Sequence, residues 1–73
     1  MGDKAVAKRF AKILRAARIR RKLTQEKLAE LSDLSVEHIQ RLEGRSPSGI
    51  RLETVVKLAK ALKIAPSSFL RDL

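Results

Sequence analysis

Apolar residues recur at intervals of three and four along most of the chain, which is the period of an amphipathic helix. Near the amino terminus, four basic residues at positions 8, 9, 12 and 15 fall largely outside the apolar stripe. The pattern therefore predicts a first helix over about residues 4–21. Its inward stripe consists of Val6, Phe10, Ile13, Leu14 and Ala17.

Two short helices are expected next, with a turn between them. Thr24 is a good N-cap because its hydroxyl can accept a hydrogen bond from an unpaired backbone N–H, so a second helix is predicted from there to about Leu31. Residues 32–35 are turn-like, because Asp33 tolerates the left-handed conformation and Ser35 can cap the helix that follows.

A third helix is expected over residues 36–43. Its inward residues are Ile39 and Leu42, so at about 100° per residue the opposite face carries Glu37 and Arg41. Two further residues, Val36 and Gln40, flank that face. The outward face of this helix therefore has no role in the core.

The remaining third of the chain predicts a loop and two more helices. Glycine and proline punctuate residues 44–49, and a new apolar stripe indicates a helix over residues 52–62. Pro66 suits the start of a final helical turn that carries Phe69 and Leu70. We expect an all-α fold, a compact bundle of about five short helices forming one domain over residues 1–73. The predicted stripe of the fourth helix is Leu52, Val55, Val56, Ala59 and Leu62.

Composition excludes several classes of protein. The 73 residues are 44% hydrophobic and include no cysteine, so a disulfide framework and a thiolate metal site are both excluded. No apolar run approaches the ~20 residues that span a bilayer, and the hydrophobic content is too high for a disordered basic tail. A compact domain stabilised by apolar packing, without a membrane-spanning segment, is indicated.

The positive charge is concentrated at the amino terminus. The chain has 17 Lys and Arg against 8 Asp and Glu, a formal charge of +9. Residues 1–23 hold nine of the basic residues and one acidic residue, whereas residues 24–50 hold three basic and five acidic residues. Such an excess favours nucleic acid or an anionic membrane surface as a partner, but it does not distinguish between them.

Residues 24–44 resemble the helix-turn-helix of the lambda-repressor-like family, which includes phage repressors, Cro proteins and restriction-modification controller proteins. The resemblance extends over about residues 10–70, because residues 14–18 and 52–62 look like the family's first and fourth helices. Ala29 has a physical reason to be small, since the two helices of the motif cross steeply and closely. Lys22 and Asp33 stand where the family commonly has glycine.

The resemblance implies a role for particular residues. The third helix is the recognition helix, and the base contacts fall on Val36, Glu37, Gln40 and Arg41. Contacts to DNA phosphates are expected from Thr24, Gln25, Ser35, Arg45, Ser46, Ser48 and Arg51. An alternative for two of these is a simple surface pair, because Glu37 and Arg41 lie four residues apart on one face.

Arg18 and Glu43 occupy positions where the resemblance implies a partly buried ion pair between the first helix and the end of the third. The alternative is two surface charges of little energetic value. We expect the structural pair and no contact of either residue with bases.

Nothing in the sequence indicates an enzyme, a metal site or a cofactor. His38 is the only histidine, and one imidazole without cysteines or clustered carboxylates is not an ordinary metal site. The three glycines match no phosphate-binding loop, and no nucleophile, base and orienting group can be assembled. No catalytic residue is therefore assigned.

These features predict a sequence-specific transcriptional regulator that binds double-stranded DNA as a homodimer on a near-palindromic operator. We expect a cytoplasmic protein, associated with a bacterial or phage nucleoid, that has no membrane partner and no small-molecule ligand. The expected dimer interface is Ile64, Phe69, Leu70 and Leu73; alternatively, Phe69 and Leu70 fold back over the fourth helix. Two other functions remain open, an antitoxin-like or coactivator-like module with a protein partner, and an amphipathic membrane-surface protein.

Overall fold

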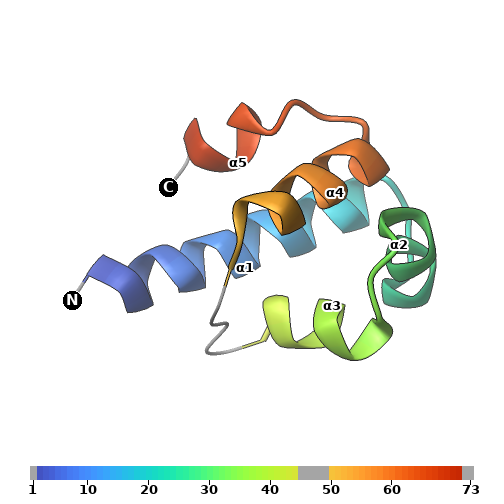
Figure 1. The fold of residues 1–73 in the computed structure, drawn as a ribbon, viewed down its shortest axis with the longest axis horizontal. Helices are drawn as coiled ribbons and strands as arrows, with labels where there is room; N and C mark the ends of the chain where they lie inside the picture. The colour runs from blue at the N-terminus through green and yellow to red at the C-terminus, as the bar shows by residue number, and fades with distance from the viewer. Residues whose placement is uncertain (1, 45–49, 72–73) are drawn as a thin grey trace.

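Five helices occupy the part of the chain that the computed structural model describes, residues 2–44 and 50–71 (Figure 1). This confirms the predicted all-α fold class. Within those residues no helix is both long and apolar enough to cross a membrane. The helices are α1 (Gly2–Arg20), α2 (Gln25–Ser32), α3 (Val36–Leu42), α4 (Leu52–Leu62) and α5 (Ser67–Arg71).

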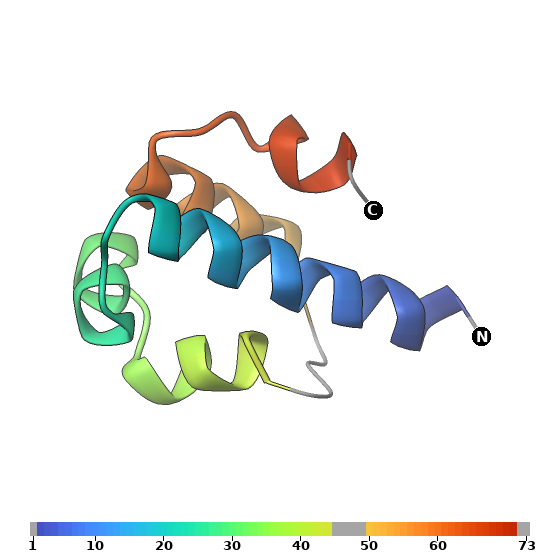
Figure 2. The same cartoon turned by 180° about the vertical axis from the view of Figure 1, so that it is seen from behind.

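The long helix α1 runs across the molecule, and the four shorter helices surround its carboxyl-terminal two thirds (Figures 1 and 2). Helix α4 lies on one side of α1, as the two opposite views show, and α5 and α3 lie at opposite edges of the molecule. Helix α2 contacts both α3 and α4, whereas α1 contacts α3 and α5. The amino-terminal turns of α1 project beyond the other helices.

All five helices contribute to a single apolar core. Fully burying one leucine, isoleucine, valine or phenylalanine side chain stabilises a fold by about 1.5–3 kcal/mol. In so small a protein the core therefore supplies most of the favourable free energy of folding. The buried core residues are Phe10, Leu14, Leu28, Ala29, Ile39, Leu42, Val55, Leu58, Ala59, Leu62 and Phe69.

Two residues predicted to face inward are exposed. Val6 is 42% exposed and Leu52 is 72% exposed. Val6 lies one turn before Phe10, the first buried core residue of α1, and Leu52 is the first residue of α4, one turn before the buried Val55. The apolar period is correct in both helices, but neighbouring elements do not reach these ends.

The turn between α2 and α3 is shorter than predicted. Ser32 belongs to α2 and is buried, and its hydroxyl donates to the carbonyl oxygen of Leu28 at 2.7 Å. The hydroxyl thus satisfies its hydrogen-bonding requirement inside the helix. The turn itself consists of residues 33–35.

Helices α1, α2 and α4 end in the same way, with one residue in the left-handed conformation. That residue is Lys22, Asp33 or Lys63, with φ of 58°, 59° and 58°. In each case the next residue is apolar, packs against the core and donates its backbone N–H to the carbonyl five residues earlier, which is the Schellman motif. These three bonds are Leu23 to Arg18 at 3.1 Å, Leu34 to Ala29 at 3.0 Å and Ile64 to Ala59 at 3.0 Å.

Candidate nucleic-acid interface

Helices α2 and α3 with the turn between them form a helix-turn-helix. The two helices contact each other, and α2 turns its buried residues Leu28 and Ala29 towards the core. The methyl side chain of Ala29 is only 5% exposed, which agrees with the close approach expected of the two backbones. Ile39 and Leu42 bury the inner face of α3 completely, at 0% exposure.

The opposite face of α3 is turned to solvent. Glu37, Gln40 and Arg41 are exposed, as the spacing predicts. Val36 differs from the prediction in part, because its side chain is half-buried and packs against the core. Three polar side chains are therefore free to meet a ligand on this face, and their contact with bases stays a prediction.

Side-chain caps fix the amino termini of both helices. The hydroxyl oxygen of Thr24 accepts from the backbone N–H of Lys27, and that of Ser35 accepts from the N–H of His38, each at 3.0 Å. Because each hydroxyl accepts in these bonds, its hydrogen remains a possible donor to phosphate. The caps are a definite structural role for two residues predicted to contact phosphate.

The predicted ion pair between Arg18 and Glu43 is confirmed. Two hydrogen bonds join them, Nε to Oε2 at 2.7 Å and Nη2 to Oε1 at 3.0 Å, and the side chains are 14% and 3% exposed. Arg18 also donates from Nη1 to the carbonyl oxygen of Leu23 at 2.8 Å. The pair therefore fixes the end of α3 against α1.

Hydrogen bonding to Glu43 raises the pKa of Arg18 above its ordinary value. Burial acts in the opposite direction, and the negative charges of Glu43 and Glu26 act in the same direction as the hydrogen bonds. Because its pKa is raised, the guanidinium of Arg18 stays charged throughout the physiological range of pH. Deprotonation of Arg18 therefore does not break the pair in that range.

Gln25, predicted to contact phosphate, takes part in the same network. Its side-chain nitrogen Nε2 donates to Oε1 of Glu43 at 3.2 Å, and the residue is half-buried. The carboxylate of Glu43 thus accepts from the first residue of α2 as well as from α1. No separate signal in the sequence indicated this link, since any polar residue suits the start of a helix.

The remaining predicted phosphate contacts follow α3 in the sequence. Arg51 is exposed and precedes α4, and its Nη1 is 4.0 Å from Oε1 of Glu53. Arg45, Ser46 and Ser48 lie outside the described residues, as does Leu73 of the predicted dimer interface.

The structure corrects the predicted dimer interface. Phe69 is 0% exposed and its ring packs on that of Phe10, with centroids 5.2 Å apart, so its side chain is unavailable to a partner. Ile64 is half-buried against the core. Leu70 is 57% exposed and Leu52, not predicted to lie at the surface, is 72% exposed.

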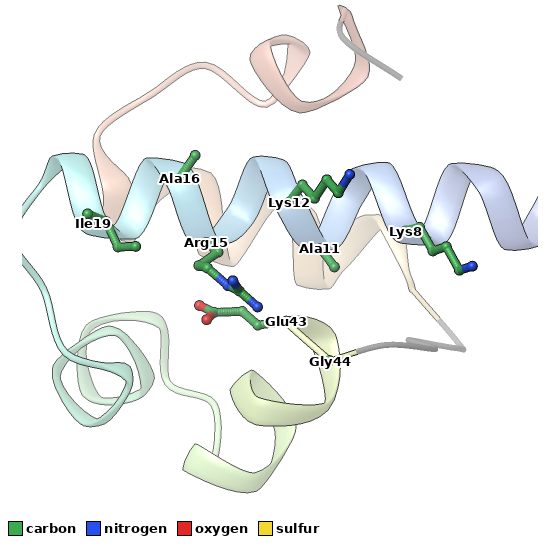
Figure 3. Close-up of a pocket in the computed structure, with 8 residues that line it drawn as sticks. All are labelled: Lys8, Ala11, Lys12, Arg15, Ala16, Ile19, Glu43 and Gly44. Carbon is green, nitrogen blue, oxygen red and sulfur yellow. The ribbon is translucent and has the colours of Figure 1, made fainter.

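An open groove separates α1 from the carboxyl-terminal end of α3 (Figure 3). Basic side chains of α1 border this groove. The count of charges along the sequence predicted an excess of basic residues in this helix but not their position beside a groove. Its lining residues are Lys8, Ala11, Lys12, Arg15, Ala16, Ile19, Glu43 and Gly44. Within residues 2–44 and 50–71, no group of three histidine or acidic side chains is placed to hold a metal ion.

Comparisons with known proteins identify the family. The model of the helix-turn-helix family HTH_3 matches residues 14–69. The crystal structure of the restriction-modification controller protein C.AhdI from Aeromonas hydrophila is 35% identical, with a TM-score of 0.83 over 89% of this chain and 97% of that chain. No curated protein sequence matches the chain significantly.

Two further structures share the fold at lower identity. The restriction-modification controller protein C.Esp1396I is 21% identical, with a TM-score of 0.80 over 90% of this chain and 84% of that chain. The clp gene regulator ClgR from C. glutamicum is 24% identical, with a TM-score of 0.82 over 92% and 86%. The chain therefore belongs to the lambda-repressor-like helix-turn-helix family and is a DNA-binding transcriptional regulator.

Proposed function

We propose that the chain binds a specific DNA sequence as a homodimer on a near-palindromic operator, with α3 in the major groove of each half-site. The observation that supports this most is the division of α3, whose residues Ile39 and Leu42 are fully buried while Glu37 and Arg41 are exposed. A dimer of this kind reads half-sites about 34–36 Å apart, one turn of the duplex.

The exposed residues of α3 have side chains suited to base edges. Arg41 can donate two hydrogen bonds to guanine, and a good bidentate pair of this kind discriminates against the wrong base by about 1–3 kcal/mol. Glu37 can accept from the amino group of cytosine, and Gln40 reaches the base edges or the backbone beside them. Only the exposed part of Val36 is available to a thymine methyl group.

Phosphate contacts position α3 in the groove. Thr24, Gln25 and Ser35 stand at the starts of α2 and α3, where backbone N–H groups and the positive end of the helix dipole attract a phosphate. Arg51 contributes from the start of α4, together with Arg45, Ser46 and Ser48, which precede it in the sequence. Such contacts strengthen binding without selecting a sequence.

The dimer surface that we propose is centred on Leu70. Leu52, the first residue of α4, is exposed as well, at 72%. Exposed leucines on a small basic domain favour burial against a second copy. Ile64 and Leu73 complete the proposed set.

The similarity to the controller protein C.AhdI supports a more specific proposal, control of restriction-modification genes. We infer that occupancy of the operator follows the concentration of the regulator itself, because we assign the chain no ligand-binding site. A cytoplasmic location follows from this proposal.

Selection of bound sites from random duplex DNA tests the proposal, with Arg41→Ala and Arg51→Ala compared against the natural chain. We expect a motif with two-fold symmetry. Arg41→Ala should relax the preference at one base pair per half-site, whereas Arg51→Ala should weaken binding to all sequences about equally. A motif that stays unchanged with Arg41→Ala contradicts the assigned base contact, and an asymmetric motif contradicts the homodimer.

A further inference from the structure

Helix α1 carries a basic stripe on the side that faces away from the core. The stripe consists of Lys8, Lys12 and Arg15, which lie four and three residues apart and so share one face of the helix. All three are exposed, and no salt bridge joins any of them to an acidic side chain of residues 2–44 and 50–71. Their charge is therefore available to an external anion.

The basic stripe borders the groove beside the recognition helix. Figure 3 shows Lys8 and Arg15 directed to the α3 side of α1, where Glu43 and Gly44 form the opposite wall. Ala11, whose small side chain is directed to α3 in the same view, lies between these walls, whereas Ala16 projects from the other edge of α1 and Lys12 is not turned to α3. The groove reaches Glu43 and Gly44 at the carboxyl-terminal end of α3, so a large ligand that extends past this end of the recognition helix meets the side of α1 that carries the stripe.

We propose that the basic stripe contacts the sugar–phosphate backbone of the same duplex that receives α3, and so extends the protein's footprint beyond the recognition helix. The inference rests on the proposed function. The major groove is about 12 Å wide and a helix with its side chains is about 10–12 Å across, so a phosphate chain stands on each side of an inserted helix. Because the groove joins α1 to the carboxyl-terminal end of α3, the proposal places one of these phosphate chains along the stripe.

The dimensions of the stripe suit a phosphate chain. Seven residues separate Lys8 from Arg15, about 10 Å along the helix axis. One DNA strand carries a phosphate about every 3.4 Å of the duplex axis, and the spacing along the strand itself is larger because the strand winds around that axis. The stripe therefore reaches about two phosphates. The small side chain of Ala11 leaves room for a deoxyribose ring in the groove.

The charges of the stripe do not stabilise α1 in the free protein. Like charges three or four residues apart on a helix repel by a few tenths of a kcal/mol, and here Lys8 and Lys12 are four apart and Lys12 and Arg15 three apart, with no acidic residue on that face. A bound polyanion removes this destabilisation, because each phosphate attracts the basic side chains that otherwise only repel one another.

An anionic membrane suits the same helix less well. A helix that lies on a membrane inserts its apolar face, but the apolar face of α1, with Phe10 and Leu14, is already buried in the core. Among the groove-lining residues that the structure describes, Ile19 is the only one with a large apolar side chain. The backbone of DNA needs charge alone, which the stripe supplies.

The test compares two charge-matched variants of the full chain, Lys8→Gln/Lys12→Gln and Lys57→Gln/Lys60→Gln. Lys57 and Lys60 are exposed on α4, which lies behind α1 when the groove is viewed from the front (Figure 3). The Kd for the selected operator is measured across salt concentrations. For the stripe variant, the slope of log K against log salt should fall by about 0.9 per lost contact, or about 1.8 per protomer.

The control variant should keep the slope of the natural chain. An equal change in both variants shows a general effect of net charge and overturns the proposal, as does an unchanged slope in the stripe variant. If the natural chain prefers no sequence, the proposed function fails, whereas the same slope comparison on any duplex still decides whether the stripe contacts phosphate.

A second measurement shortens the DNA. On a duplex trimmed to the selected motif, the natural chain should lose affinity relative to a duplex with long flanks, and Lys8→Gln/Lys12→Gln should lose much less. If the natural chain and the variant lose the same affinity on the trimmed duplex, the stripe does not contact the flanking DNA and the proposal is overturned. Binding of vesicles containing phosphatidylserine that depends on the stripe, together with an unchanged DNA slope, assigns the stripe to membranes and overturns the proposal.

Discussion

Phe69 and Leu70 are adjacent in α5 but lie in opposite environments. The ring of Phe69 is fully buried, with its centroid 5.2 Å from that of Phe10, whereas Leu70 is 57% exposed. One residue of this five-residue helix therefore attaches it to α1, and the next is presented to solvent. The two side chains can be tested separately for stability and for association.

Replacing Phe69 with Ala should destabilise the protein by about 3–5 kcal/mol, because a large buried aromatic side chain is lost and a cavity remains beside Phe10. A domain of this size has little stability to lose, so the variant should be largely unfolded at 25 °C. Urea denaturation followed by circular dichroism measures the change. A loss below about 1 kcal/mol would show that α5 contributes little to the core.

Replacing Leu70 with Asp should leave the fold intact and weaken dimerisation. An exposed side chain contributes little to folding, and changes at such positions are usually within about 0.5 kcal/mol. Sedimentation velocity should show a shift from dimer to monomer. Leu31→Asp is the matched control, since Leu31 is also an exposed leucine, at 49%, but lies on α2. If Leu31→Asp dissociates the dimer and Leu70→Asp does not, the proposed dimer surface is wrong.

Breaking the Arg18–Glu43 pair on one side should cost more than removing it. Arg18→Met leaves the carboxylate of Glu43, 3% exposed, without its charged partner, which typically costs about 3–5 kcal/mol. The double variant Arg18→Met/Glu43→Leu should recover most of that loss, because no buried charge remains unpaired. Thermal unfolding of both variants checks this. Equal destabilisation of the single and double variants would mean that shape, and not charge pairing, decides the contribution.

The helices were predictable because the residues that form them carry independent signals. The apolar period placed the inward faces of α1 and α3, and Thr24 and Ser35 marked the starts of α2 and α3. Periodicity gives the face that a helix buries but not where its neighbours end, so Leu52 was predicted to be buried although it lies beyond the packed part of α4.

The candidate site was predictable where it depends on one helix and not where it depends on two. The outward position of Arg41 follows from the spacing of buried residues within α3. The link from Gln25 to Glu43 and the groove between α1 and α3 depend on how separate helices approach, which no local pattern encodes. Phe69 was ambiguous for the same reason, since its partner Phe10 is distant in sequence.

Lys63 is held in a conformation that glycine adopts more easily, so Lys63→Gly should stabilise the protein. Its φ of 58° costs a residue with a side chain about 1–2 kcal/mol, and the greater freedom of glycine in the unfolded chain offsets part of the gain. We expect a net increase of about 0.5–1 kcal/mol, seen as a higher urea midpoint at unchanged slope. Lys60→Gly removes the same charge from the interior of α4 and should instead destabilise by about 1 kcal/mol. If the two replacements change the free energy of unfolding in opposite directions, backbone conformation, and not charge, is the cause. If both destabilise the protein, the side chain of Lys63 itself supports this end of the helix.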